Sequence, residues 1–217
     1  MISKFTFVYC CVFLFFMANE SESDTIHVSE FSDSSLKGWE EKQFKNSTSY
    51  RLSQIEDKQI LIADSQNNAS ALIKKVHIDI KKYPYLNWIW RIEKRLDTEN
   101  EKMKPGDDHA ARIYVIIDGG NFFWRTRAVN YVWANQSSKG EIWENPFVGR
   151  NTMMMALRDR QDKLSTWYVE KRNVYEDMKR LFETDFHFID AIAIMTDTDN
   201  SHGQAKAYYG DIYFSKE

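Results

Sequence analysis

Three ionisable side chains stand together in one turn of the chain. Asp107, Asp108 and His109 follow a Pro-Gly pair and lead directly into the apolar run of residues 113–117. Proline fixes φ and glycine adds backbone freedom, so this segment is predicted to turn just before a strand. Loops held at the end of a rigid strand often carry binding or catalytic residues. We therefore take this turn as the first candidate site.

Two carboxylates held at a fixed distance can cleave a polysaccharide by general acid-base catalysis. Asp107 or Asp108, together with Glu141, are the candidate catalytic residues for such a hydrolase or lyase. The alternative is structural, because a buried aspartate often pairs with an inward arginine, here Arg112 or Arg127. Both interpretations stay open, since the sequence gives no distance between the carboxyl groups.

A second group of aspartates lies near the C-terminus. Asp197 and Asp199 fall in a polar loop, and Asp211 follows on the last predicted strand. Hard oxygen ligands at short spacing suit calcium, so these three residues are the candidate metal ligands and calcium is the candidate cofactor. The loop lacks the glycine and the closing glutamate of an EF-hand. The alternative is a structural turn, because aspartate and asparagine bond to nearby backbone groups.

Aromatic and charged residues are interleaved in the middle of the chain. Five of the seven tryptophans lie between residues 88 and 143, among several arginines. Aromatic faces beside hydrogen-bonding groups suit sugar rings, which have an apolar face and a rim of hydroxyls. The candidate ligand-binding residues are therefore Asp107, Asp108, Arg112, Arg127, Asn130, Trp143 and Asp199.

Some of the tryptophans have a structural explanation instead. Trp88 and Trp90 alternate with Leu86 and Ile92, so all four are predicted to face the core from one strand. Trp143 stands in a loop, where it is either a binding platform or a lid on the end of the fold.

The elements that must position these residues are mostly short strands. About ten apolar or alternating runs are separated by polar turns, without βαβ alternation and without an internal repeat. This pattern predicts an all-β protein, a two-sheet antiparallel β-sandwich of jelly-roll type. One short helix is expected after Asn173, with apolar residues at Val174, Met178, Leu181 and Phe182. The polar stretch 96–106 is expected to be an exposed loop.

Composition limits the partners. The 217 residues are 43% hydrophobic, which is enough for the core of one domain. Charged residues make up 28% and nearly cancel, with a formal net charge of −3. Because no basic surface is indicated, nucleic acid is not an expected partner, and neither is an anionic membrane surface.

The N-terminus has the pattern of a leader. Lys4 precedes an uncharged apolar run over residues 5–17, which is shorter than the roughly 20 residues that span a bilayer. We expect a signal peptide over residues 1–23, a single β-sandwich domain over residues 24–217 and a periplasmic or secreted location, with no stable transmembrane segment in the mature chain. The alternative is an uncleaved N-terminal anchor. Cys10 and Cys11 both lie in this leader, so no disulfide is expected in the mature chain.

Several ordered motifs together resemble one family. The chain is similar to the bacterial family catalogued as domain of unknown function 3047 from about Phe31 onward. The resemblance implies an exported bacterial protein without an assigned activity. The run Tyr209-Gly210-Asp211 is also similar to the closing strand of galactose-binding-like jelly rolls. The motifs that carry the family resemblance are Pro84-x-Leu86-x-Trp88-x-Trp90-Arg91, residues 104–114, residues 126–133, Asn145-Pro146-Phe147, Glu170-x-Arg172-Asn173-Val174, residues 194–200 and Tyr209-Gly210-Asp211-Ile212.

Three functions fit these observations. The favoured hypothesis is an exported bacterial β-sandwich that binds a carbohydrate or another polar cell-envelope ligand, at a site built from the loops 97–110, 135–147 and 196–204. The first alternative is a polysaccharide hydrolase or lyase that uses a carboxylate pair. The second is a structural or protein-interaction module whose aromatic surface contacts a partner.

Overall fold

The computed structural model describes residues 23–98 and 100–217. Residues 1–22 of the expected signal peptide, with Cys10 and Cys11, lie outside the described residues. Over the described ranges, no helix combines the length and the apolar character needed to cross a membrane.

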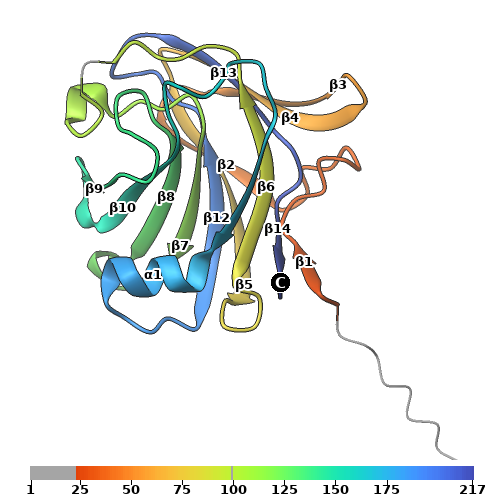
Figure 1. Cartoon of the computed structure of the whole chain (residues 1–217), viewed down its shortest axis with the longest axis vertical. Coiled ribbons are helices and arrows are strands. Elements are labelled where there is room, and N and C mark those ends of the chain that lie inside the picture. Colours follow the sequence, from red (N-terminus) through yellow and green to blue (C-terminus); the bar gives the residue numbers. More distant parts are fainter. Residues whose placement is uncertain (1–22, 99) are drawn as a thin grey trace, which may run out of the picture.

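Two seven-stranded sheets face each other and form a sandwich (Figure 1). The first sheet has the order β1-β14-β6-β13-β4-β3. In addition, β11 pairs with β6 outside this order, and β13 and β14 pair with different parts of β6. Its strands are β1 (Thr25–His27), β14 (Tyr213–Ser215), β6 (Tyr85–Ile92), β13 (Gln204–Tyr209), β4 (Lys58–Gln66), β3 (Ser49–Ile55) and β11 (Tyr168–Asn173). The first strand of the described chain therefore pairs with the last one.

The second sheet has the order β2-β5-β12-β7-β8-β10-β9. Among the described strands, β8 and β10 form the one parallel pair, and the other pairings are antiparallel. The predicted fold class, a mainly antiparallel two-sheet sandwich, is confirmed. Its strands are β2 (Trp39–Lys45), β5 (Ala69–Asp79), β12 (Phe188–Met195), β7 (Arg112–Ile117), β8 (Arg127–Trp133), β10 (Gly149–Arg158) and β9 (Ile142–Asn145), and the short 3-10 turns are η1 (Lys104–Gly106) and η2 (Phe123–Arg125).

The core lies between the inner faces of the two sheets. Leu86, Trp88, Trp90 and Ile92 of β6 are all buried, as their alternation predicts. Trp88 stacks on Tyr131 of the opposite sheet, with 5.6 Å between the ring centroids. The aromatic rings of β6 and β8 therefore fill the space between the sheets.

One helix, α1 (Val174–Phe182), closes an end of the sandwich (Figure 1). Its position is the one predicted from the sequence, and the Asn173 side chain caps it by accepting a hydrogen bond from the Glu176 backbone N–H at 3.0 Å. The Tyr131 hydroxyl donates to Asp177 at 2.8 Å. This contact attaches the helix to the second sheet.

The outer face of the second sheet is hollow. Ile113 and Val115 of β7 point into the core, so Arg112 and Tyr114 point outward. Their register neighbours on β12 are Met195 and Ala193. Most of the outward residues on β5 and β12 are small or unbranched, namely Ala69, Ala71, Ala193 and Met195, and this leaves a depression over the middle of the sheet.

Candidate functional site

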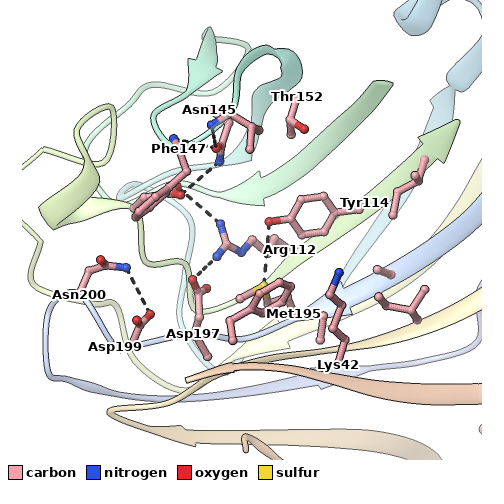
Figure 2. Close-up of a pocket in the computed structure, with 18 residues that line it drawn as sticks. Lys42, Arg112, Tyr114, Asn145, Phe147, Thr152, Met195, Asp197, Asp199 and Asn200 are labelled. Atoms are coloured by element: carbon pink, nitrogen blue, oxygen red, sulfur yellow. Dashed lines mark hydrogen bonds and ion pairs between the residues drawn. The ribbon is translucent and has the colours of Figure 1, made fainter. Parts of the chain in front are cut away.

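A cavity of about 490 Å³ lies on this outer face (Figure 2). The volume falls within the range typical of small-molecule sites. Its floor comes from β5, β12 and β7, and its sides come from β2, from the turn between β9 and β10, and from the loops before β7 and after β12. The lining residues that matter below are Lys42, Phe44, Asp107, Arg112, Tyr114, Asn145, Phe147, Thr152, Asp197 and Asp199.

Buried carboxylates bring the three predicted site loops together. Glu101 accepts hydrogen bonds from the backbone N–H groups of Asn135, at 2.6 Å, and Gln136, at 3.0 Å. Asp108 accepts from the backbone N–H groups of Ser201, at 2.6 Å, and Asn200, at 3.2 Å. The loops 97–110, 135–147 and 196–204 thus lie side by side around one end of β7.

Arg112 is the central charge of the site. Its side chain is only 3% exposed and pairs with the Asp197 carboxylate, and its Nη1 atom lies 3.5 Å from Asp107 Oδ1. The Asn145 side-chain amide donates to the other oxygen of Asp107 at 3.2 Å. Figure 2 shows Arg112 between Asp197 and Asn145, with Phe147 and Tyr114 on either side.

Negative charge exceeds positive charge in this buried cluster. Burial raises the pKa of Asp197 to about 7, because desolvation outweighs the attraction of Arg112. Desolvation opposes the charge on Arg112, but the neighbouring carboxylates, Asp197 first among them, hold its pKa above its usual value. The guanidinium therefore stays charged, and Asp197 is poised to gain a proton near neutral pH.

Several polar atoms at the floor lack a hydrogen-bond partner among the described residues. They are Nε and Nη1 of Arg112 and Oδ1 of Asp107, and both side chains line the cavity. These atoms have almost no exposed surface, and Arg112 Nη1 lies 3.5 Å from Asp107 Oδ1, so the two side chains face each other and form a polar floor under the cavity. Donors and an acceptor stand next to each other, which suits a ligand that both donates and accepts.

Exposed apolar side chains flank this polar floor. Phe44 is 60% exposed and Phe147 is 53% exposed, and both line the cavity. Lys42 lies over the Phe44 ring and Lys104 over the Phe147 ring, each with its ammonium group 5.5 Å from the ring centroid. The cavity therefore combines aromatic surfaces at its sides with hydrogen-bonding groups at its base.

Of the predicted ligand-binding residues, Asp107, Arg112 and Asp199 line the cavity, and the others lie elsewhere. Asp108 clamps the 199–201 loop, and Asn130 is fully buried beside Tyr114 on β8. Trp143 is 8% exposed and packs with Val132 and Met154, so it covers the sheet and offers no open platform.

Two further predicted site residues, Arg127 and Glu141, also lie away from the cavity. Arg127 donates to the backbone carbonyls of Trp124 and Thr126 at the far end of β8. Glu141 pairs with Lys102 and accepts from the backbone N–H of Ser138. Neither Arg127 nor Glu141 is among the described residues that line the cavity.

The predicted calcium ligands do not form one set. Asp211 accepts hydrogen bonds from Ser32, whereas Asp108, Asp197 and Asp199 have carboxylate oxygens within 4.8 Å of one another. Asp108 is thus the third carboxylate of this group, where Asp211 was predicted. Both oxygens of Asp108 accept N–H groups, and Asp197 pairs with Arg112, so protein groups already balance much of this cluster.

His109 lies behind the cavity wall. It is fully buried, with Nδ1 3.3 Å from the Trp133 carbonyl oxygen and Nε2 3.5 Å from Asp107 Oδ1. Its imidazole is therefore a neighbour of the site and does not line the cavity.

Sequence reasoning missed several residues of the site. Tyr114 could have been found, because it alternates with Ile113 and Val115 and shares a face with Arg112. Glu101 and Leu96 are buried although they lie in the stretch predicted to be exposed. Phe44 gives no local signal, since only the register of β2 beside β5 brings it to the cavity.

Solved structures with similar folds include two carbohydrate-binding modules of Clostridium thermocellum. The family 30 module of the cellulosomal cellulase Cel9D-Cel44B has a TM-score of 0.49 and 8% identity, covering 83% of this chain and 92% of that chain. The family 11 module of Lic26A-Cel5E has a TM-score of 0.47 and 8% identity, covering 90% of this chain and 96% of that chain.

A third similar structure is the glycoside hydrolase domain of Endo-D from Streptococcus pneumoniae R6. The TM-score is 0.42 and the identity is 8%. The match covers 82% of this chain and 22% of the longer Endo-D chain. At these scores and identities the likenesses carry no argument about function. No curated protein matches this sequence.

A family match covers most of the chain. Residues 37–213, which extend from just before β2 into β14, match the family described as "Protein of unknown function (DUF3047)". This match confirms the resemblance seen in the motifs. The chain therefore belongs to this family.

Proposed function

We propose that the protein binds a carbohydrate, or another polyhydroxylated cell-envelope ligand, in the cavity over Arg112. The observation that carries this proposal is the combination, in one cavity, of a buried polar floor formed by Arg112 and Asp107 with the exposed rings of Phe44 and Phe147 at the sides. A sugar ring offers an apolar face to aromatic side chains and hydroxyls to such a floor.

The charges at the floor favour a neutral ligand over an anion. Arg112 is already paired with Asp197 and lies close to Asp107, so its positive charge is largely balanced. An incoming carboxylate or phosphate would meet these two aspartates as well as the guanidinium. A hydroxyl group can instead donate to Asp107 and accept from Arg112 without adding charge.

Export is part of the same proposal. The lysine and the apolar run at the N-terminus support a signal peptide over residues 1–23, and the domain over 24–217 then works in the periplasm or outside the cell. Fractionation of cells that express the full chain tests this. We expect a shortened protein in the periplasm or the medium, and a full-length protein in the cytoplasm would contradict export.

Binding is tested by screening residues 24–217, which include every described strand, on a glycan array and by calorimetry. We expect at least one bacterial or plant polysaccharide to bind, and Phe147→Ala to weaken that binding. The matched control is Val169→Ala, because Val169 is exposed but does not line this cavity. A folded sample that binds none of the glycans would refute the proposal.

A second candidate is polysaccharide cleavage, and one observation favours it. Two carboxyl groups, Asp107 and Asp197, line the same cavity, and burial raises the pKa of Asp197 to about 7. Such a carboxyl can act as a general acid near neutral pH while a second remains ionised. Turnover of a bound polysaccharide that disappears in Asp197→Asn, with binding retained, would support this candidate over binding alone.

A further inference from the structure

The cavity is elongated across the strands. Its lining includes Lys42 and Phe44 on β2 at one side and Thr152 on β10 at the other. In the sheet order, β2 and β10 are separated by β5, β12, β7 and β8. Five spacings of about 4.8 Å each give a path of about 24 Å along the sheet from β2 to β10. A ligand that touches both sides must therefore be long.

The β2 side of the cavity lies at the edge of the sheet. In the sheet order of the described strands, β5 is the one neighbour of β2, and Phe44 is strongly exposed there. The structure described therefore has no further strand that would stop a ligand at this side. A chain molecule can continue past Phe44.

An aromatic pair lies close to Asn151, the residue before Thr152. The side-chain amide of Asn151, next to Thr152, donates to the Trp124 carbonyl oxygen at 3.3 Å. Trp124 is 53% exposed and Phe122 is 44% exposed, and their ring centroids are 5.1 Å apart. Neither ring belongs to a core cluster of the described residues. Two adjacent exposed rings of this kind are typical of a binding surface.

We infer that the cavity holds an internal stretch of a linear polysaccharide laid across the strands, and that Trp124 and Phe122 contact the same chain beyond Thr152. This inference rests on the proposed carbohydrate binding and deepens it. Arg112 and Asp107 bind hydroxyls in the middle, Phe44 and Phe147 contact rings at the sides, and the Trp124–Phe122 pair supplies a further stacking surface. A chain end is not required, because the cavity reaches the open edge of the sheet.

The test uses residues 24–217 and a panel of soluble linear polysaccharides, namely mixed-linkage β-glucan, xylan, polygalacturonate and alginate, in affinity gel electrophoresis. For a polymer that retards the protein, sedimentation then gives the number of protein molecules bound to each polymer chain. We expect many molecules per chain. One or two per chain would mean that the cavity binds chain ends, and the inference would be overturned.

Variants test the role of the aromatic pair. We expect Trp124→Ala, and separately Phe122→Ala, to weaken binding to the retarding polymer about tenfold. Phe188→Ala is the matched control, since Phe188 is also exposed but stacks on His77 away from the cavity. The inference would be overturned if both test variants kept their affinity for the polymer while Phe147→Ala bound it more weakly. The proposed function would then still stand. If no polymer of the panel retards the protein although the glycan array shows binding, the inference fails alone, and if neither experiment shows binding, both fail.

Discussion

At the scale of single residues, Arg112 determines whether the buried charges are tolerated. It is the arginine within contact of two buried carboxylates, Asp107 and Asp197. Removing one partner of a buried ion pair leaves an uncompensated charge, which is far more costly than losing a surface pair. The candidate site and the stability of the fold therefore depend on the same side chain.

Substitution of Arg112 tests this dependence. We expect Arg112→Met to lower the free energy of unfolding by about 3–5 kcal/mol at pH 7, because Asp107 and Asp197 lose their buried counter-charge. Urea denaturation measures the change. Arg160→Met is the control, since Arg160 is half exposed and lies 4.0 Å from its partner Asp97. Equal stability of the two variants would contradict this account of the cluster.

The pH dependence of stability tests the environment of Asp197. Its pKa is about 7 in the folded protein against an ordinary value of 3.8, so the folded state binds more protons between these values. This group therefore stabilises the fold most below pH 4, and that contribution is lost as the pH rises from about 4 through about 7. We expect Asp197→Asn to flatten this part of the curve of unfolding free energy against pH. A variant with the same slope as the wild type would rule out Asp197 as its source.

At the scale of elements, Asp108 acts as a clamp between two loops. Its carboxylate accepts from the backbone of Asn200 and Ser201, so the turn before β7 fixes the loop after β12. The two cavity-lining aspartates of that loop, Asp197 and Asp199, depend on this clamp for their positions. Asp108 was predicted to be a candidate catalytic residue, but its hydrogen bonds give it a structural role in holding the loop.

Loss of this clamp has a measurable result. We expect Asp108→Ala to lower the free energy of unfolding by about 1–3 kcal/mol, because two backbone N–H groups lose their acceptor. Amide hydrogen exchange should become faster over residues 198–203 while the core strands keep their protection. Asp97→Ala is the control, since Asp97 is fully exposed. Unchanged exchange in the loop would mean that Asp108 does not hold it.

At the scale of the whole molecule, a polar contact connects the two sheets. Glu170 of β11 accepts from the Trp90 indole N–H at 2.9 Å and pairs with Arg158 of β10, which belongs to the other sheet. We expect Glu170→Ala to lower the free energy of unfolding by about 3 kcal/mol, because the Trp90 indole N–H and the Nε of Arg158 both lose their acceptor. Glu170→Gln keeps an acceptor and should lose less. Thermal unfolding of the two variants measures this, and a reversed order would contradict it.

The sequence predicted those parts of the fold that follow from local periodicity. The alternation of Leu86 to Ile92 predicts the core face of β6, and Asn173 marks the start of α1. The site was predicted less completely, because its side chains come from segments that only the sheet order brings together. Phe44 lies at the cavity because β2 pairs with β5. Asp211 lies away from it because this residue stands between β13 and β14, which both belong to the other sheet.

The pairing of β1 with β14 has a consequence for the order of folding. Residue 25 pairs with residue 215, and β14 is the strand that joins β1 to β6 (Figure 1). Closing so long a loop is entropically costly and slow, so this edge of the sheet forms last. A chain that is still being synthesised cannot complete its first sheet before Ser215 has emerged.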